Sequence, residues 1–156
     1  MGWLWGAYQL AIRWLWGGFE VALGWLGVRY AFHELAHAWW AAQAQSGCAS
    51  RPIVESGVVR IISNPGYSQG ARFTPGDLIS RLQTFAAQTN HEFWPDDVSL
   101  RDGQLFAAER IHSSRQLTDL YLLALATKHA GRLATSDQAI PISPVCGAKT
   151  ESHCVI

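Results

Sequence analysis

The chain has 156 residues, of which 49% are hydrophobic and 15% are charged. This length suits one ordinary domain with a core of its own, and so apolar a composition argues against disorder. Twelve basic residues balance twelve acidic ones, which excludes a bulk positive field, so any binding of nucleic acid has to be local or shared with a partner.

Residues 1–32 form a Trp-rich apolar segment that differs from the rest of the chain. It holds five of the eight Trp residues, and Trp3, Trp14 and Trp25 recur at intervals of eleven. Eleven residues make three helical turns, so the repeat predicts one apolar stripe along a helix. Glu20 interrupts the segment, and no uncharged run reaches the roughly 18 residues of a membrane span. We therefore expect no stable span, whereas an apolar docking or membrane-surface segment stays open.

From residue 33 onward, helical and extended patterns alternate. Thr74, Pro75 and Asp77 supply a capping hydroxyl, a first-turn proline and an acid, which together predict a helix start. Ser99 and Asp102 repeat this pattern ahead of a short apolar stretch. The predicted helices cover 34–45, 53–62, 74–89 and 105–111, and the predicted strands cover 48–50, the region ending near 93–95, 132–135 and 154–156.

A last helix is predicted with Thr118 as its cap and Gly131 at its end. Helices and strands of this length in alternation predict an α/β domain with a parallel sheet. The three cysteines, Cys48, Cys146 and Cys154, lack C-x-x-C spacing. This spacing argues against a disulfide framework or a zinc knuckle, and it favours a reducing cytoplasm.

Three carboxylates stand where a lone charge is costly. Glu55 falls on an apolar helix, Asp119 in the first turn of another, and Asp137 directly after a predicted strand. Two of them have an ordinary explanation, because acids such as Asp119 are favoured at helix N-termini and Asp137 is suited to cap residues 138–140. However, the crevice beyond the strand ends is where open α/β sheets keep their sites. Converging acids there suit Mg²⁺ or Mn²⁺, which activate water for phosphodiester hydrolysis.

Several segments taken together resemble the PIN-domain toxins of the VapC type. They are VESGVVRIISNP from Val54, FWPDDVSL from Phe93, TDLYLLALA from Thr118 and GRLATSD from Gly131, in the family's order, with HELAHAWW from His33 similar to its early helix. The resemblance implies a PIN-like three-layer α/β fold over residues 33–156, with a mostly parallel central sheet flanked by helices.

The resemblance also implies a function. Members of that family are metal-dependent ribonucleases that cleave tRNA or rRNA, are silenced by a cognate antitoxin and usually work as homodimers. Carried over to this chain, the family pattern makes Glu55, Asp119 and Asp137 the ligands of Mg²⁺ or Mn²⁺. Thr118 and Thr135 would support them by hydrogen bonds.

The chain departs from that family at its start. The family opens with a strand like LLDVNVLIALAW whose Asp binds metal, whereas the matching position here holds Trp16, and Glu20 is out of register. Either the Trp repeat replaces this strand, or the reading frame or start upstream of His33 is not the ancestral one. Because a lost ligand weakens metal binding, a catalytically impaired, antitoxin-binding protein is an alternative.

A second motif competes for the functional assignment. His33, Glu34 and His37 match H-E-x-x-H, which on a helix places two imidazoles toward zinc with the glutamate as general base. A metzincin continuation would require Gly and His where the chain has Trp40 and Gln43. A zinc metalloprotease is thus a further alternative, set against a half-buried helix in which His37 packs near Trp40.

Overall fold

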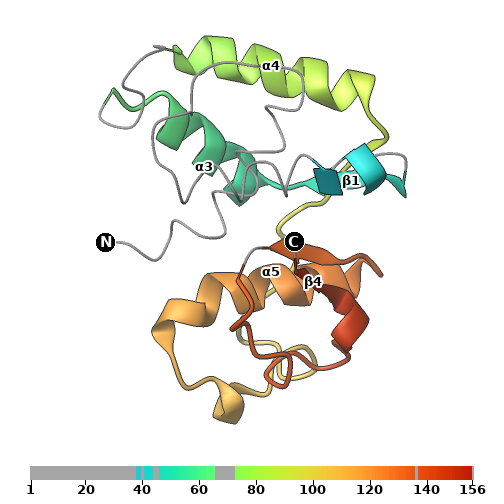
Figure 1. The fold of residues 1–156 in the computed structure, drawn as a ribbon. Coiled ribbons are helices and arrows are strands. Elements are labelled where there is room, and N and C mark those ends of the chain that lie inside the picture. The colour runs from blue at the N-terminus through green and yellow to red at the C-terminus, as the bar shows by residue number, and fades with distance from the viewer. Residues whose placement is uncertain (1–37, 40, 44–45, 66–72, 136, 156) are drawn as a thin grey trace. The chain divides into compact units, whose positions relative to one another are not determined.

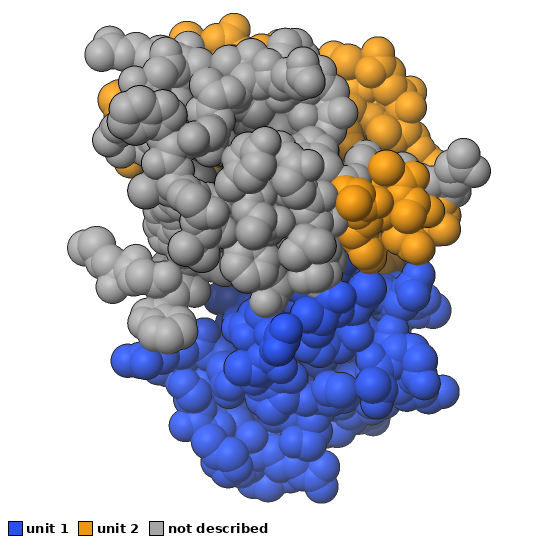
Figure 2. All heavy atoms as spheres, viewed as in Figure 1, with its two compact units in different colours: residues 1–7, 96–156 blue, residues 8–95 orange. Residues whose placement is uncertain are grey.

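A computed structural model describes residues 38–39, 41–43, 46–65, 73–135 and 137–155. These divide into two compact units, whose boundary falls between Pro95 and Asp96 (Figure 2). The Trp repeat, the boundary predicted after residue 32 and the H-E-x-x-H motif lie outside the described residues. Of the helix predicted at 34–45, residues 38–39 and 41–43 are described and are helical.

The unit that ends at Pro95 contains one parallel strand pair. Strand β1 (Cys48–Ser50) pairs with β2 (His91–Phe93), with Cys48 opposite His91. Backbone hydrogen bonds from Cys48 N to Asn90 O and from Trp94 N to Ser50 O extend the ladder at both ends, at 2.9 and 2.8 Å. Both strands were predicted, and the parallel pairing is confirmed.

Two helices pack together in the same unit (Figure 1). Helix α3 (Pro52–Ile62) begins with a proline and buries Val58 and Ile62, which lie one turn apart on the same face. Helix α4 (Pro75–Gln88) has the full capping box between Thr74 and Asp77, as the sequence predicted, and buries Leu78.

The unit that begins at Asp96 is built around α5 (Leu117–Lys128). Residues 122–126 of this helix are apolar and buried without a break, so its middle is buried on all sides, which is typical of a helix surrounded by protein. Strand β3 (Leu133–Thr135) packs against it and pairs in parallel with β4 (His153–Val155). The residues of α5 that are buried are Leu120, Leu122, Leu123, Ala124, Leu125 and Ala126.

The helix predicted at 105–111 is wrong. Asp102 Oδ1 accepts from Gln104 N at 2.8 Å, which forms a turn instead of a cap. Leu105 O and Ala107 N then bond to the 144–146 segment, so these groups are not available to a helix ladder. Three short 3₁₀ helices complete this unit: η2 (Ala108–Arg110), η3 (Ser114–Gln116) and η4 (Thr150–Ser152).

The ends of α5 also differ from the prediction. Its N-cap is Gln116, and Thr118 lies within the first turn, because η3 leads directly into the helix. At the other end, Gly131 N bonds to Ala126 O at 2.8 Å, and the left-handed residue that permits this bond is Ala130, with φ of 52°.

Because Ala130 carries a side chain in the left-handed conformation, we predict that its replacement by glycine stabilises the protein. Ala130→Gly is expected to raise the free energy of unfolding by about 0.5 to 1 kcal/mol, because relief of the left-handed strain exceeds the added entropy of the unfolded chain. Urea unfolding measures the change. Ala87→Gly, at an exposed position inside α4, is the control and should lower stability by about 1 kcal/mol. Equal losses in the two variants would contradict the prediction.

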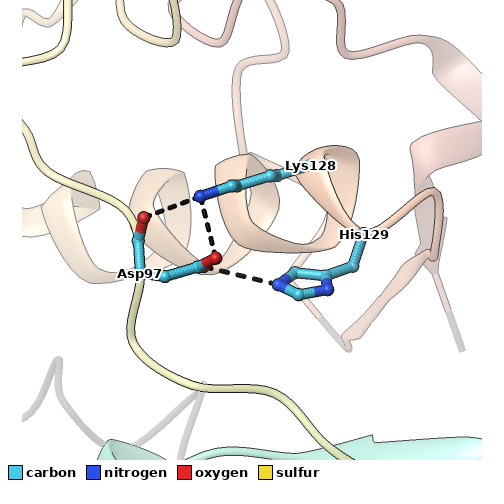
Figure 3. A network of polar contacts seen from close by, with 3 residues as sticks. All are labelled: Asp97, Lys128 and His129. Carbon is cyan, nitrogen blue, oxygen red and sulfur yellow. Dashed lines mark hydrogen bonds and ion pairs between the residues drawn. The ribbon is translucent and has the colours of Figure 1, made fainter.

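Asp97 contacts two residues at the C-terminal end of α5, Lys128 and His129 (Figure 3). Lys128 Nζ lies 2.8 Å from both Asp97 Oδ2 and Asp97 O, and His129 Nε2 lies 3.4 Å from Asp97 Oδ1. The hydrogen bond from Lys128 is the main cause that lowers the pKa of Asp97. This contact anchors the start of the unit to a helix end that already favours positive side chains.

Two further features of the described residues concern the cysteines and the length of the helices. All three cysteines are described and are free thiols, as their spacing predicted. Among the described helices, none has the length and apolarity that crossing a membrane would need. The described elements form an α/β arrangement in which both strand pairs are parallel.

Candidate functional site

Asp119 lies in the first turn of α5, and the packing of this buried helix fixes its position. Its neighbour Leu120 is fully buried, and Asp119 itself is half-buried. Burial, first, and the negative charge of Asp137, second, raise the pKa of the Asp119 carboxyl to about 6, against an opposing effect of His153. A pKa raised this far means that the surrounding protein groups stabilise the negative charge of the Asp119 carboxylate poorly.

Asp137 is placed by a turn that follows β3. Its backbone N–H donates to Oγ1 of Thr135 at 3.0 Å, and Thr135 is buried. Asp137 Oδ1 accepts from Ala139 N at 2.7 Å. These bonds form a local turn of the kind that aspartate favours, and they set the exposed Asp137 carboxylate beyond the carboxyl end of β3.

His153 is a member of this group that the sequence prediction missed. It begins β4, opposite Leu133 of β3, and its Nε2 lies 3.2 Å from Asp137 O. Because a carbonyl oxygen only accepts, Nε2 carries the hydrogen of this bond. No spacing signal relates residues 137 and 153; only the parallel pairing of β3 with β4 brings them together.

The chemistry of this pair fits a hard divalent cation. Burial and the nearby charge of Asp137 raise the pKa of Asp119, and a cation bound beside Asp119 would relieve this cost of its negative charge. Mg²⁺ is commonly bound through one or two protein carboxylates, with water and phosphate oxygens completing its shell. Over the part of the chain that the structure describes, no cluster of three or more His, Cys, Asp or Glu side chains is arranged to hold a metal.

Glu55, the third predicted ligand, lies in the other unit. It is half-buried in the first turn of α3, where its N–H bonds to Arg51 O at 3.0 Å. Its Oε1 accepts a short hydrogen bond from Ser50 Oγ. The structure thus places Asp119 and Asp137 within one unit, while metal binding by Asp119, Asp137 and Glu55 stays a prediction. The support of these carboxylates by Thr118 and Thr135 stays a prediction as well. The zinc motif His33, Glu34 and His37 falls outside the described residues.

Comparison with known proteins gives several relatives in Mycobacterium tuberculosis. The chain is 42% identical to ribonuclease VapC44 over 124 residues, which are 78% of this chain and 83% of that protein. It is 37% identical to ribonuclease VapC39 over 118 residues, or 76% and 84% of the two chains. Ribonuclease VapC29 is 33% identical over 108 residues, or 69% and 74%. No protein-family model and no solved structure matches the chain.

These relatives decide the family. Identities of this size extend over more than two thirds of both chains, so they include far more than a shared motif. The resemblance carried by the segments around Glu55, Asp119 and Asp137 is thereby confirmed. The chain belongs to the VapC ribonuclease family.

Proposed function

We propose that the protein is the toxin component of a toxin–antitoxin system, an endoribonuclease that hydrolyses RNA phosphodiesters with Mg²⁺ or Mn²⁺. The observation that carries this proposal is the relationship of the chain to VapC ribonucleases, supported by a half-buried Asp119 whose pKa is raised by burial and then by the charge of Asp137 beyond β3. Such a pair destabilises the metal-free protein at neutral pH. Asp119 and Asp137 would hold a cation there, which would offset their charge and supply a ligand for an RNA phosphate.

In this proposal, each candidate residue has a role in binding the metal or in positioning a ligand. Asp119 and Asp137 hold the metal, and Glu55 is the third ligand that the sequence predicts. Thr135 fixes the turn that aims Asp137, and Thr118 supports Asp119 from the same helical turn. When bound, the metal supplies a polarised water and charge stabilisation for in-line attack on the phosphodiester.

The family relationship extends this proposal to partners and fold. A cognate antitoxin would silence the enzyme, and the substrate would be an RNA of the tRNA or rRNA class in the cytoplasm. A homodimer is the expected working form. The three-layer PIN-like arrangement, with a mostly parallel central sheet, is the fold that we infer around the two parallel strand pairs.

Metal removal tests the proposal directly. Cleavage of a mixture of tRNA and rRNA should stop in EDTA and return on addition of excess Mg²⁺ or Mn²⁺. Asp137→Asn should lower the rate by about 100-fold or more, because it removes a ligand. Asp96→Asn, at an exposed aspartate of the same unit, should leave the rate unchanged. Cleavage that persists in EDTA, or in Asp137→Asn, would sink the proposal.

The replacement of the first-strand Asp by Trp16 favours a second candidate, an antitoxin-binding protein with impaired catalysis. This candidate predicts weak metal binding together with normal antitoxin binding. Calorimetry with Mg²⁺ separates the two, because micromolar affinity counts against the impaired protein. Weak affinity with no cleavage would replace the first proposal by the second.

A further inference from the structure

Three side chains from separate elements form a continuous line of hydrogen bonds in the unit that ends at Pro95. Ser50 Oγ, at the end of β1, bonds to Glu55 Oε1 in the first turn of α3. On its other side, Ser50 Oγ lies 2.8 Å from Nε2 of His91, which begins β2. Glu55 is the predicted ligand of this unit, so the line ends on a candidate metal-binding group.

The proton positions along this line follow from the chemistry of the three groups. Ser50 Oγ donates its single hydroxyl hydrogen to Glu55 Oε1. The Ser50 oxygen is then left to accept, and His91 Nε2 must be the donor to it. The line therefore runs in one direction, from His91 through Ser50 to Glu55, and His91 carries a hydrogen on Nε2.

The strand pair explains why these residues meet. Cys48 is opposite His91 in the parallel register, and side chains two residues apart on a strand point to the same face. Ser50 therefore shares the face of Cys48 and comes within reach of the His91 ring. The ring of Phe85, from α4, meets the His91 ring edge-on, with 5.9 Å between centroids and 72° between planes. This contact packs Phe85 against the imidazole and so restricts the rotation of the ring.

We propose that Ser50, held in turn by His91, is a positioning residue that sets the orientation of the Glu55 carboxylate for metal binding. This inference rests on the proposed function, because it takes Glu55 as a ligand. A hydroxyl donor on Oε1 restricts the rotation of the carboxylate and leaves Oε2 as the oxygen presented to a cation. Outer partners of this kind tune metal affinity by about 10- to 100-fold when they are lost.

Metal binding without RNA is the readout that tests the inference. Calorimetric titration of the full chain with Mn²⁺ should show about 10- to 100-fold weaker affinity for Ser50→Ala than for the wild type. Ser50→Thr keeps the hydroxyl and should restore the affinity. The matched control is Ser80→Ala, at an exposed serine of α4, which should bind as the wild type does.

Substitutions at His91 provide a second and independent test of the positioning role. His91→Gln keeps an N–H donor toward Ser50 and should bind Mn²⁺ with nearly wild-type affinity, whereas His91→Leu removes the donor and should bind more weakly. In ¹⁵N NMR spectra of the metal-free protein, His91 should carry its hydrogen on Nε2. Ser50→Ala should release this ring to a mixture of tautomers, which tests the bond between Ser50 and His91, while the Mn²⁺ affinity tests the positioning of Glu55.

The possible outcomes distinguish the inference from the proposed function. If Glu55→Gln weakens Mn²⁺ binding while Ser50→Ala and His91→Leu do not, the positioning role is overturned and the proposed function stands. If Glu55→Gln binds Mn²⁺ as the wild type does, Glu55 is not a ligand and the inference fails with it, while Asp119 and Asp137 are still tested by their own variants. If Ser50→Ala does not fold, the contrast between His91→Gln and His91→Leu decides.

Discussion

Asp119→Asn should abolish RNA cleavage and, at the same time, raise the free energy of unfolding of the metal-free protein at pH 7. The pKa of Asp119 is raised to about 6 in the folded chain, mainly by burial and then by the charge of Asp137. The stability that this carboxyl supports is fully present below its unfolded pKa, near 4, and is lost as the pH rises through 6. At pH 7 its charge therefore opposes folding.

The size and the pH window of this effect are both measurable. Urea unfolding in EDTA at pH 7 should show Asp119→Asn to be more stable than the wild type by about 1 kcal/mol, once solvent screening of a half-exposed group is allowed for. At pH 4 the difference should vanish. Asp77→Asn is a control of opposite sign, because hydrogen bonds from Thr74 lower the pKa of Asp77. Its stabilising charge is present at pH 7 and is lost as the pH falls through its lowered pKa.

Bound metal should reverse the order of stability, so that the wild type becomes more stable than Asp119→Asn. A ligand at 100 times its dissociation constant stabilises the folded state by about 2.7 kcal/mol, so Mn²⁺ should raise the melting temperature of the wild type but not that of Asp119→Asn. Cleavage should fall by about 100-fold or more in the variant. Loss of stability in EDTA at pH 7, or an undiminished response to Mn²⁺, would contradict this account of Asp119.

Leu123→Ala should cost about 3 kcal/mol of unfolding free energy, because Leu123 belongs to the core of the unit that begins at Asp96. Leu123 is fully buried in α5, and its removal leaves a cavity whose lining loses contacts on one side. Leu100→Ala is the matched control, since Leu100 is 46% exposed and its truncation should cost well under about 1 kcal/mol. Urea unfolding with equal m-values measures both changes.

This variant also bears on the site, because the same helix carries Asp119. If the packing of α5 holds that carboxylate in place, Leu123→Ala should lower the Mn²⁺ affinity even under conditions where the variant is fully folded. Similar losses of stability in Leu123→Ala and Leu100→Ala would show that α5 is not the core of this unit.

Elements with complete local signals were predicted closely from the sequence. The start of α4 follows from Thr74, Pro75 and Asp77, whose capping bonds span three residues and need no tertiary context. The helix predicted at 105–111 had a similar signal in Ser99 and Asp102, yet its backbone pairs with the 144–146 segment. A local pattern does not indicate whether a distant partner competes for the same hydrogen bonds.

The sequence by itself determined the family, the parallel strands, the position of Asp119 in the first turn of its helix and that of Asp137 after β3, because motif order and local periodicity contain this information. Only the tertiary structure decided that His153 lies beside Asp137, and that Ser50 joins His91 to Glu55. Each of these contacts depends on the register of a parallel strand pair. That register is set by packing between segments far apart in the chain, which no spacing along the sequence records.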